Sequence, residues 1–93
     1  MKPQFLVHNE GDNVGVAVAD IKSGDKLTGA CLENGAQFSL SAKDGIPLGH
    51  KVALKEIKKG DNVVKYGIAI GKATQPIVTG NHVHVHNLKT NRW

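Results

Sequence analysis

The sequence has few of the residues on which many protein classes depend. It contains one cysteine, Cys31, and its aromatic residues make up only 4% of the 93 positions. A single cysteine forms no internal disulfide, which excludes a disulfide-stabilised secreted scaffold and favours a reducing, cytoplasmic compartment. So few aromatic residues disfavour modules that stack nucleic-acid bases. No apolar run approaches the roughly 18 residues needed to span a membrane, so we expect no membrane partner.

Charge of one sign is also sparse. The 12 lysines and arginines exceed the eight acidic residues by four, and they are scattered singly or in pairs. Without a basic stripe we expect no nucleic-acid partner, whereas a small anionic substrate fits the excess. The sequence also has no phosphate-binding glycine loop, nucleophile elbow or paired carboxylates. We expect residues 1–93 to form one small domain without a complete catalytic set of its own.

Short bursts of alternating apolar residues are the main pattern along the chain. This period of two is typical of strands with one buried face, and 11 glycines and three prolines disfavour long helices. We predict a mostly β domain, a compact folded-over sheet with short hairpins and at most one or two short helical turns. The alternating positions are Phe5 and Val7; Val14, Val16 and Val18; Phe38 and Leu40; Val52 and Leu54; Ile68 and Ile70; and Val83 and Val85.

A turn motif of the form Ile-x-x-Gly-Asp/Asn recurs at residues 21–25, 57–61 and 77–81. In each copy an apolar anchor precedes a glycine that can take a positive φ, and a strand follows. The spacings are uneven, which excludes a solenoid and indicates one turn device reused within a folded sheet. Asn34-Gly35 separately predicts a hairpin.

Histidines carry most of the chemical content. Three of the five, His82, His84 and His86, alternate with Val83 and Val85. On an extended strand the histidines would share the open face and the valines would face the core. Residues two apart lie about 6.6 Å apart and could share a metal, but residues four apart lie about 13 Å apart. A metal site would therefore use two neighbouring histidines and a ligand from elsewhere; the alternative is a solvated polar face.

Other candidate residues give weaker signals. His50-Lys51 follows a glycine turn and suits an anionic ligand, whereas His8 fits a strand edge. The apolar neighbours of Cys31 indicate a buried, inert thiol. The C-terminal residues 88–93 end in Arg92-Trp93, which predicts either a frayed end or a tail that contacts a partner subunit.

Several motifs together resemble the N-terminal SAF-type (β-clip) domain of the altronate/galactarate dehydratase family. The resemblance extends over nearly the whole chain, with the motifs in the family's order. The residues that carry it are 49–54, 57–61, 64–67, 70–71 and 80–87. It implies a β-clip fold and membership of a lyase family. In the sugar-acid dehydratases the domain is fused to a much larger catalytic region.

A free-standing chain of this length resembles the small (alpha) subunits of the (2R)-sulfolactate sulfo-lyases. These work with a separate large (beta) catalytic subunit, cleave 3-sulfolactate to pyruvate and sulfite, and depend on iron. The resemblance therefore implies a small anionic hydroxy acid as substrate. It also implies Fe2+ or another divalent metal shared with the large subunit, which would supply the general base. In isolation the chain would be inactive, and a homo-oligomer is compatible with the sequence.

The resulting assignment gives catalytic, metal-binding and substrate-binding roles to six residues. Two alternatives from other classes stay open: a small subunit of an altronate/galactarate-type hydro-lyase, and a non-catalytic module that binds a metal or a sugar acid. A purely structural domain is a further alternative, because fold does not fix function. The predicted residues are His84 and His86 for catalysis; His82, His84 and His86 for the metal; and His50, Lys51 and Asn87 for the substrate.

Overall fold

The computed structural model describes residues 2–90, which form nine strands and no helix. The predicted mostly β fold with short hairpins is confirmed. Residues 2–90 therefore contain no helix long and apolar enough to cross a membrane. The strands are β1 (Phe5–Val7), β2 (Val14–Ala17), β3 (Lys26–Cys31), β4 (Gln37–Ser41), β5 (Lys51–Ala53), β6 (Asn62–Lys65), β7 (Ile68–Ala73), β8 (His82–Val83) and β9 (Leu88–Thr90).

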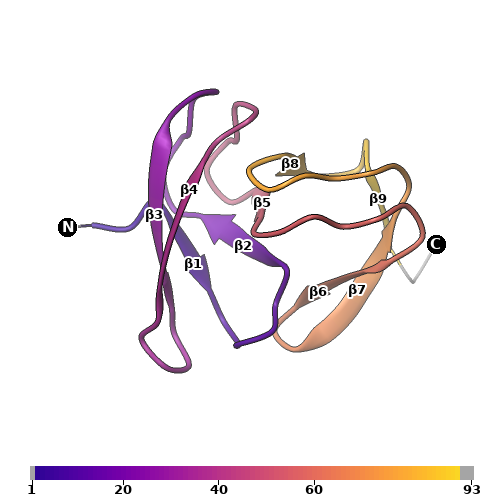
Figure 1. The fold of residues 1–93 in the computed structure, drawn as a ribbon, viewed down its shortest axis with the longest axis horizontal. Coiled ribbons are helices and arrows are strands. Elements are labelled where there is room, and N and C mark those ends of the chain that lie inside the picture. Colours follow the sequence, from indigo (N-terminus) through magenta and orange to yellow (C-terminus); the bar gives the residue numbers. More distant parts are fainter. Residues whose placement is uncertain (1, 91–93) are drawn as a thin grey trace.

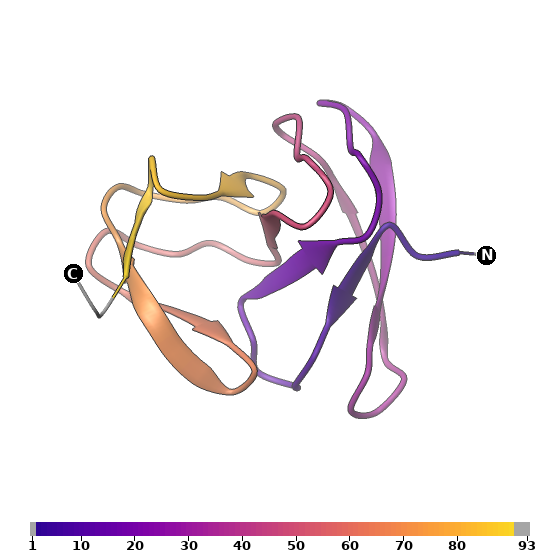
Figure 2. The ribbon, with the colours of Figure 1, turned by 180° about the vertical axis from the view of Figure 1, so that it is seen from behind.

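The strands form a curled six-stranded sheet and a smaller three-stranded sheet. The larger sheet has the order β4-β3-β1-β2-β5-β8, in which only the β1–β3 pair is parallel, and the smaller has the order β6-β7-β9. The β3–β4 hairpin and the three-stranded sheet lie at opposite ends of the long axis (Figure 1). Seen from behind, β1 and β2 lie between them (Figure 2).

Two hydrophobic cores lie on the two faces of β2 and β5. Ala17 and Val52 belong to the first core, which surrounds Phe5. Val14 and Ala53 belong to the second, which reaches the three-stranded sheet. The division follows from the period of two, because successive side chains of a strand point to opposite faces. Strand β5 therefore lies between the cores, and its two faces meet different surroundings.

The recurring turn motif occurs four times in the structure, one time more than the sequence analysis recognised. The fourth copy is residues 46–50, in which His50 follows the glycine. In every copy the glycine N–H donates to the carbonyl of a buried alanine, and the alanine N–H donates back to the residue after the glycine. The glycine–alanine pairs are Gly24–Ala42, Gly49–Ala17, Gly60–Ala73 and Gly80–Ala53.

These turns also pair with one another. Ile21 forms an antiparallel bridge with Ile46, and Ile57 forms the same bridge with Ile77. All four isoleucines are at most 5% exposed, which confirms them as anchors. The predicted Asn34-Gly35 hairpin is confirmed as well, since it joins β3 to β4. Local turn signals therefore explain most of the topology.

The predicted strand over His82–His86 is wrong beyond its second residue. Strand β8 ends at Val83, and residues 84–87 form a turn. Val83 is fully buried as expected, but Val85 is 79% exposed and does not face the core. The physical reason is Asn87, whose side chain bonds back to the backbone at His84 and closes the turn.

The expected C-terminal tail requires a second correction. Residues Leu88–Thr90 form β9, which pairs with β7, and Leu88 is only 7% exposed within the second core. This part of the predicted tail is a structural strand. Arg92 and Trp93 lie outside the described residues, so their contact with a partner stays a prediction.

Candidate functional site

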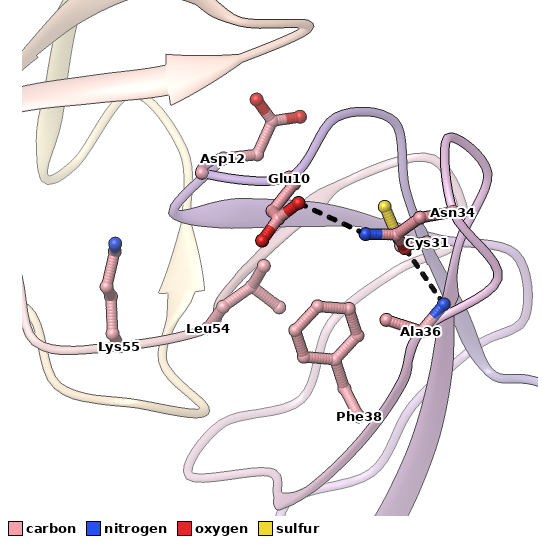
Figure 3. A pocket seen from close by; sticks show the side chains of 9 residues that line it. Glu10, Asp12, Cys31, Asn34, Ala36, Phe38, Leu54 and Lys55 are labelled. Carbon is pink, nitrogen blue, oxygen red and sulfur yellow. Dashed lines mark hydrogen bonds between the residues drawn. The ribbon is translucent and has the colours of Figure 1, made fainter.

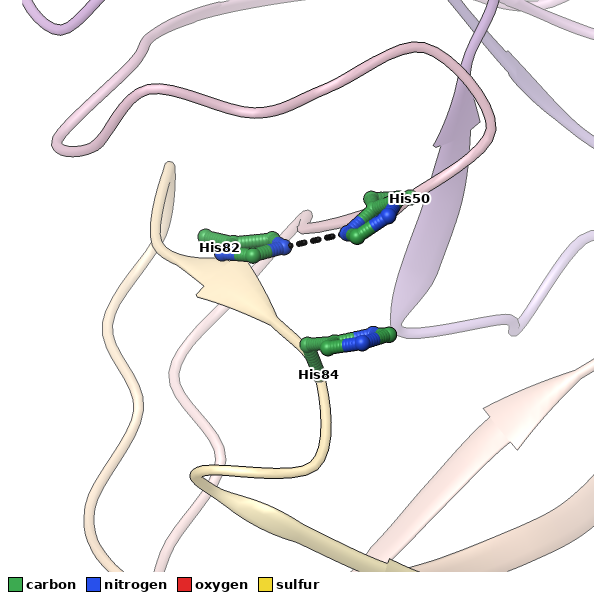
Figure 4. Close-up of side chains that lie close together, drawn as sticks. All are labelled: His50, His82 and His84. Atoms are coloured by element: carbon green, nitrogen blue, oxygen red, sulfur yellow. Dashed lines mark hydrogen bonds between the residues drawn. The ribbon is translucent and has the colours of Figure 1, made fainter.

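His50, His82 and His84 converge on one point of the surface. One ring nitrogen from each lies within 4.8 Å of the other two, and Nδ1 of His50 lies 2.8 Å from Nε2 of His82. Figure 4 shows the three rings turned toward one another, with His50 ahead of β5 and the other two on or just after β8. All three residues are half-buried. We call this group the histidine cluster.

His50 reaches the histidine cluster because of the fourth turn and the strand register. Val52 of β5 lies opposite His82 of β8, so both side chains point to one face of the sheet. His50 precedes Val52 by two residues and shares that face. The 46–50 turn starts β5 at this point, with its glycine at φ 87°.

Asp44 fixes the backbone at His82. One carboxylate oxygen, Oδ2, accepts hydrogen bonds from the N–H of His82 at 2.9 Å and from Nδ2 of Asn81 at 3.0 Å. The N–H of Lys43 also donates to the carbonyl of Gly80. The 41–44 segment thus supports the turn that leads into β8, a role that the sequence analysis did not assign to it.

Asn87 holds His84 in place. Its Oδ1 accepts from the N–H of His84 at 2.9 Å, and its Nδ2 donates to the carbonyl of His82 at 2.8 Å. Asn87 is 4% exposed. Asn87 therefore positions His84, and its contact with substrate stays a prediction. The bend at this turn brings His84 beside His50, with ring centroids 4.3 Å apart.

His86 lies beside the histidine cluster but outside it. Its ring centroid is 5.2 Å from that of His82, with the planes tilted by 41°, and the residue is exposed. The close group therefore contains His82 and His84 as predicted, with His50 in the place expected for His86. The sequence analysis did foresee that a ligand from elsewhere in the fold was needed.

Burial and neighbouring charged groups lower the pKa of two members of the cluster, His82 and His84. Desolvation, followed by His50, His86 and His84, lowers the pKa of His82 below its usual 6.5, and Asp44 partly opposes this. Desolvation also lowers the pKa of His84, with His50, Lys51 and His86 adding to the shift. Neutral imidazole is the form that ligates metals, so these nitrogens are available at neutral pH.

The donor set fits a transition metal. Imidazole nitrogens suit Fe2+ and Zn2+, and three of them leave coordination positions for a substrate or for a residue of a partner. Lys51, a predicted substrate-binding residue, begins β5 directly after His50, so the two side chains leave opposite faces of the strand. Its contact with substrate stays a prediction. Burial and then the charge of Lys65 lower the pKa of Lys51.

A separate pocket of about 300 Å3 is lined by no member of the histidine cluster (Figure 3). Its acidic groups are engaged in structural bonds: Asp12 accepts from the N–H groups of Tyr66 and Gly67, and Glu10 accepts from Asn34. It therefore does not supply a second cluster of metal ligands. The lining residues are Glu10, Gly11, Asp12, Cys31, Asn34, Ala36, Phe38, Leu54 and Lys55.

Comparison with known proteins identifies the family. The model of the altronate/galactarate dehydratase SAF domain matches residues 3–91. The chain belongs to this family. The match includes the whole histidine cluster, together with Asp44 and Asn87. The resemblance inferred from the sequence motifs is confirmed.

Relatives of the SAF family member fall into two groups. The (2R)-sulfolactate sulfo-lyase subunit alpha of Chromohalobacter salexigens is 42% identical over 94 residues, covering all of both chains. The subunit of the same name from Paracoccus pantotrophus is 55% identical over 58 residues, covering 62% of this chain and 87% of that one. Altronate dehydratase of Bacillus subtilis is 45% identical over 91 residues, but this chain spans only 17% of its length.

Proposed function

We propose that this chain is the small subunit of a metal-dependent (2R)-sulfolactate sulfo-lyase, which releases sulfite from 3-sulfolactate and leaves pyruvate. The convergence of three imidazoles at His50, His82 and His84 carries the proposal of a metal site. The chain matches the Chromohalobacter salexigens alpha subunit over its full length, which favours this lyase over a sugar-acid dehydratase. That relative's name, a subunit, supports a large catalytic partner for this chain.

The reaction explains why a cationic site is needed. Sulfolactate carries a carboxylate, a 2-hydroxyl and a sulfonate, and elimination begins with loss of the C2 proton. Fe2+ or another divalent ion bound by the cluster would supply a Lewis acid for the negative charge that develops. His50, His82 and His84 hold that position, and Asn87 and Asp44 fix the backbone that carries the last two. The resulting enolpyruvate becomes pyruvate.

The large subunit completes the site in this proposal. No described residue near the cluster combines a free carboxylate with access to the substrate, since Asp44 is bonded to the backbone of His82 and to Asn81. We assign the base that removes the C2 proton to the large subunit. The chain alone would therefore bind metal without turning over sulfolactate.

Co-expression tests this function directly. The chain is produced with and without a candidate large subunit from the same genome, under anaerobic and iron-replete conditions, and sulfite and pyruvate are measured from (2R)-3-sulfolactate. We expect equal amounts of the two products only when both chains are present. Product formation by either chain alone would contradict the division of roles.

A matched pair of variants tests the site assignment. His84→Ala should abolish turnover and lower the metal-to-protein ratio of the chain while the two subunits still assemble. His8→Ala removes a histidine that stacks on Tyr66 outside the cluster, so it should leave the metal ratio unchanged. Full activity of the assembled His84→Ala complex would show that the site lies elsewhere.

A sugar-acid dehydratase subunit is the second candidate. The 45% identity to altronate dehydratase of Bacillus subtilis supports it. The same elimination would run with hydroxide as the leaving group. Formation of a 2-keto-3-deoxy acid from altronate or galactarate, without sulfite from sulfolactate, would favour this candidate. Metal binding without turnover of any of the three substrates would instead favour a non-catalytic binding module.

A further inference from the structure

The positive charge of the chain is concentrated in one half of it. Residues 2–53, which form most of the larger sheet, carry five lysines and six acidic residues. Residues 54–90, which include all three strands of the smaller sheet, carry six lysines and two acidic residues. A charge excess confined to one part of a small domain directs its electrostatic field toward one side. The feature to explain is therefore the charge around the smaller sheet.

Lys72 and Lys89 lie directly opposite each other on neighbouring strands of that sheet (Figure 1). Ala73 and Leu88, the next pair along the same strands, are buried in the second core, so the two lysines point away from it. Both lysines are exposed. Side chains directly opposite in an antiparallel pair have Cβ atoms about 5 Å apart, and like charges at such positions are destabilising.

Two more lysines lie beside this pair. Lys58 and Lys59 belong to the 57–61 turn, and both are exposed. The N–H of Gly60 donates to the carbonyl of Ala73 at 2.8 Å, and the N–H of Ala73 donates back to the turn at 2.9 Å. The turn is thus hydrogen-bonded to the end of β7. We call these four exposed side chains the basic face: Lys58, Lys59, Lys72 and Lys89.

No internal counter-charge neutralises the basic face. In the part of the chain that the structure describes, none of its four lysines forms an ion pair. The two acidic residues of this half, Glu56 and Asp61, therefore leave the lysines unpaired. Asn62, which lies opposite Lys72 in β6, is neutral. A like-charge pair that opposes the stability of its own sheet is expected where a surface serves an interaction.

The basic face is joined to the histidine cluster through the backbone. The N–H of Leu88 donates to the carbonyl of His84 at 2.9 Å, and Lys89 follows Leu88 directly. The N–H of Thr74, at the end of β7, donates to the carbonyl of Asn87 in the same turn at 2.9 Å. A protein that covers the basic face therefore also lies next to the turn that carries His84.

We propose that the basic face is the surface on which the large subunit docks, through an acidic patch of that subunit. This proposal rests on the proposed function, in which a large subunit completes the site at the histidine cluster. A second copy of the chain is a poorer occupant, because a two-fold axis would set the same lysines against each other. A nucleic acid is also poorer, because β7 and β9 carry no aromatic side chain on which bases could stack.

Binding of a candidate large subunit from the same genome, measured by calorimetric titration, tests the surface. Lys72→Glu/Lys89→Glu should raise the Kd at about 50 mM salt by about 100-fold, because acidic groups then face acidic groups. Lys22→Glu/Lys26→Glu changes the net charge equally at exposed positions of the other half, so it should bind far more tightly than the first variant. Equal weakening in the two double variants would mean that only net charge matters, and would overturn the docking surface.

Two checks separate lost binding from lost structure. Lys72→Glu/Lys89→Glu should unfold at nearly the urea concentration of the wild type, because a like-charge pair is exchanged for another. Carbodiimide crosslinking, which joins ammonium groups to carboxylates in contact, needs no variant. In the wild-type complex it should link Lys72 or Lys89 to acidic residues of the large subunit. Links that come only from Lys22 or Lys26 would overturn the proposal.

The outcomes also separate this surface from the function on which it rests. Weak binding of Lys72→Glu/Lys89→Glu to the large subunit, with no sulfite released by the wild-type complex, would support the surface and reject the sulfo-lyase. Normal binding of that variant, with sulfolactate turnover by the wild-type complex, would keep the lyase and overturn the surface. A salt-sensitive dimer of the chain alone, or tighter binding to a duplex oligonucleotide than to the large subunit, would overturn it if the same variant abolished either.

Discussion

The four copies of the turn share a backbone but divide into two kinds. The turns at 21–25 and 57–61 end in aspartate, and the glycine of each faces open space. The turns at 46–50 and 77–81 both depart from this pattern. His50 replaces the acidic residue in one, and in the other a Cβ on Gly80 would overlap the carbonyl oxygen of Ser41. The two departures are the turns that carry the histidine cluster.

The residue after the glycine serves the turn itself in one turn of each kind, whereas His50 serves the site. In two turns the residue after the glycine closes its own loop: Asp25 accepts from the N–H of Lys22, and Asn81 accepts from the N–H of Val78. His50 instead directs its ring toward His82. Each isoleucine bridge joins a turn that ends in aspartate to a turn that carries part of the histidine cluster. The first turn of each pair therefore helps to position the second.

The largest expected effect comes from Gly80→Ala. A positive φ costs an alanine about 1–2 kcal/mol, and the overlap with the Ser41 backbone adds about 1–3 kcal/mol. Urea unfolding should show this loss together with loss of metal binding. Gly24→Ala has nearly the same φ but open space around the Cβ, so it should cost only the first amount. Equal losses in the two variants would contradict the close approach at Gly80.

His50→Asn should separate site from fold. The variant makes the 46–50 turn resemble the 77–81 turn, in which Asn81 occupies the equivalent position. We expect a metal affinity at least about 100-fold weaker, as one of three ligands is lost, with a free energy of unfolding within about 1 kcal/mol of wild type. Calorimetric titration with Fe2+ or Zn2+ and urea unfolding measure the two quantities. Retained affinity would remove His50 from the site.

Asp44→Ala should have an intermediate effect. It removes the acceptor of two hydrogen bonds, one from the His82 N–H, at a cost of about 1–3 kcal/mol in unfolding free energy. Metal affinity should fall about tenfold, since a ligand loses its support. Asp25→Ala is the matched control, because Asp25 accepts from the N–H of Lys22 in a turn that carries no member of the histidine cluster. An unchanged metal affinity in Asp44→Ala would show that the 77–81 turn positions His82 without Asp44.

The smallest expected effect is on pH dependence. The pKa values of His82 and His84 lie below the usual 6.5 in the folded chain, so protonation favours the unfolded state. The metal-free chain should keep its full stability above pH 6.5 and lose part of it as the pH falls below that value. Urea unfolding at pH 7.5 and pH 5.5 measures the loss, which His84→Asn should reduce. A rise in stability on acidification would contradict the sign.

The sequence predicts the fold better than it predicts the site. Period two, the Asn34-Gly35 hairpin and the turn glycines depend on local physical chemistry. The structure confirms the strands and turns that they predict, although Val18 and Ile68 of the alternating positions are exposed. The position of His50 depends on strand register between β5 and β8, which alternation alone does not specify. The sequence signal for this position was the fourth turn, Ile46 to His50, whose glycine pairs with a buried alanine as in the other three turns.

The bend after Val83 was hidden for a related reason. The alternation of histidine and valine predicts a continuing strand, but a single side chain, Asn87, makes two backbone bonds that end it. Such competition between a side chain and a sheet is decided by three-dimensional context. The bend brings His84 to His50 and leaves His86 aside.

X-ray absorption of the anaerobically prepared, Fe2+-loaded chain tests the central claim most directly. The account predicts three imidazole nitrogens around the iron in the wild-type chain and two in His50→Asn. A wild-type spectrum without imidazole scattering, or one that His50→Asn leaves unchanged, would contradict a metal site built from His50, His82 and His84.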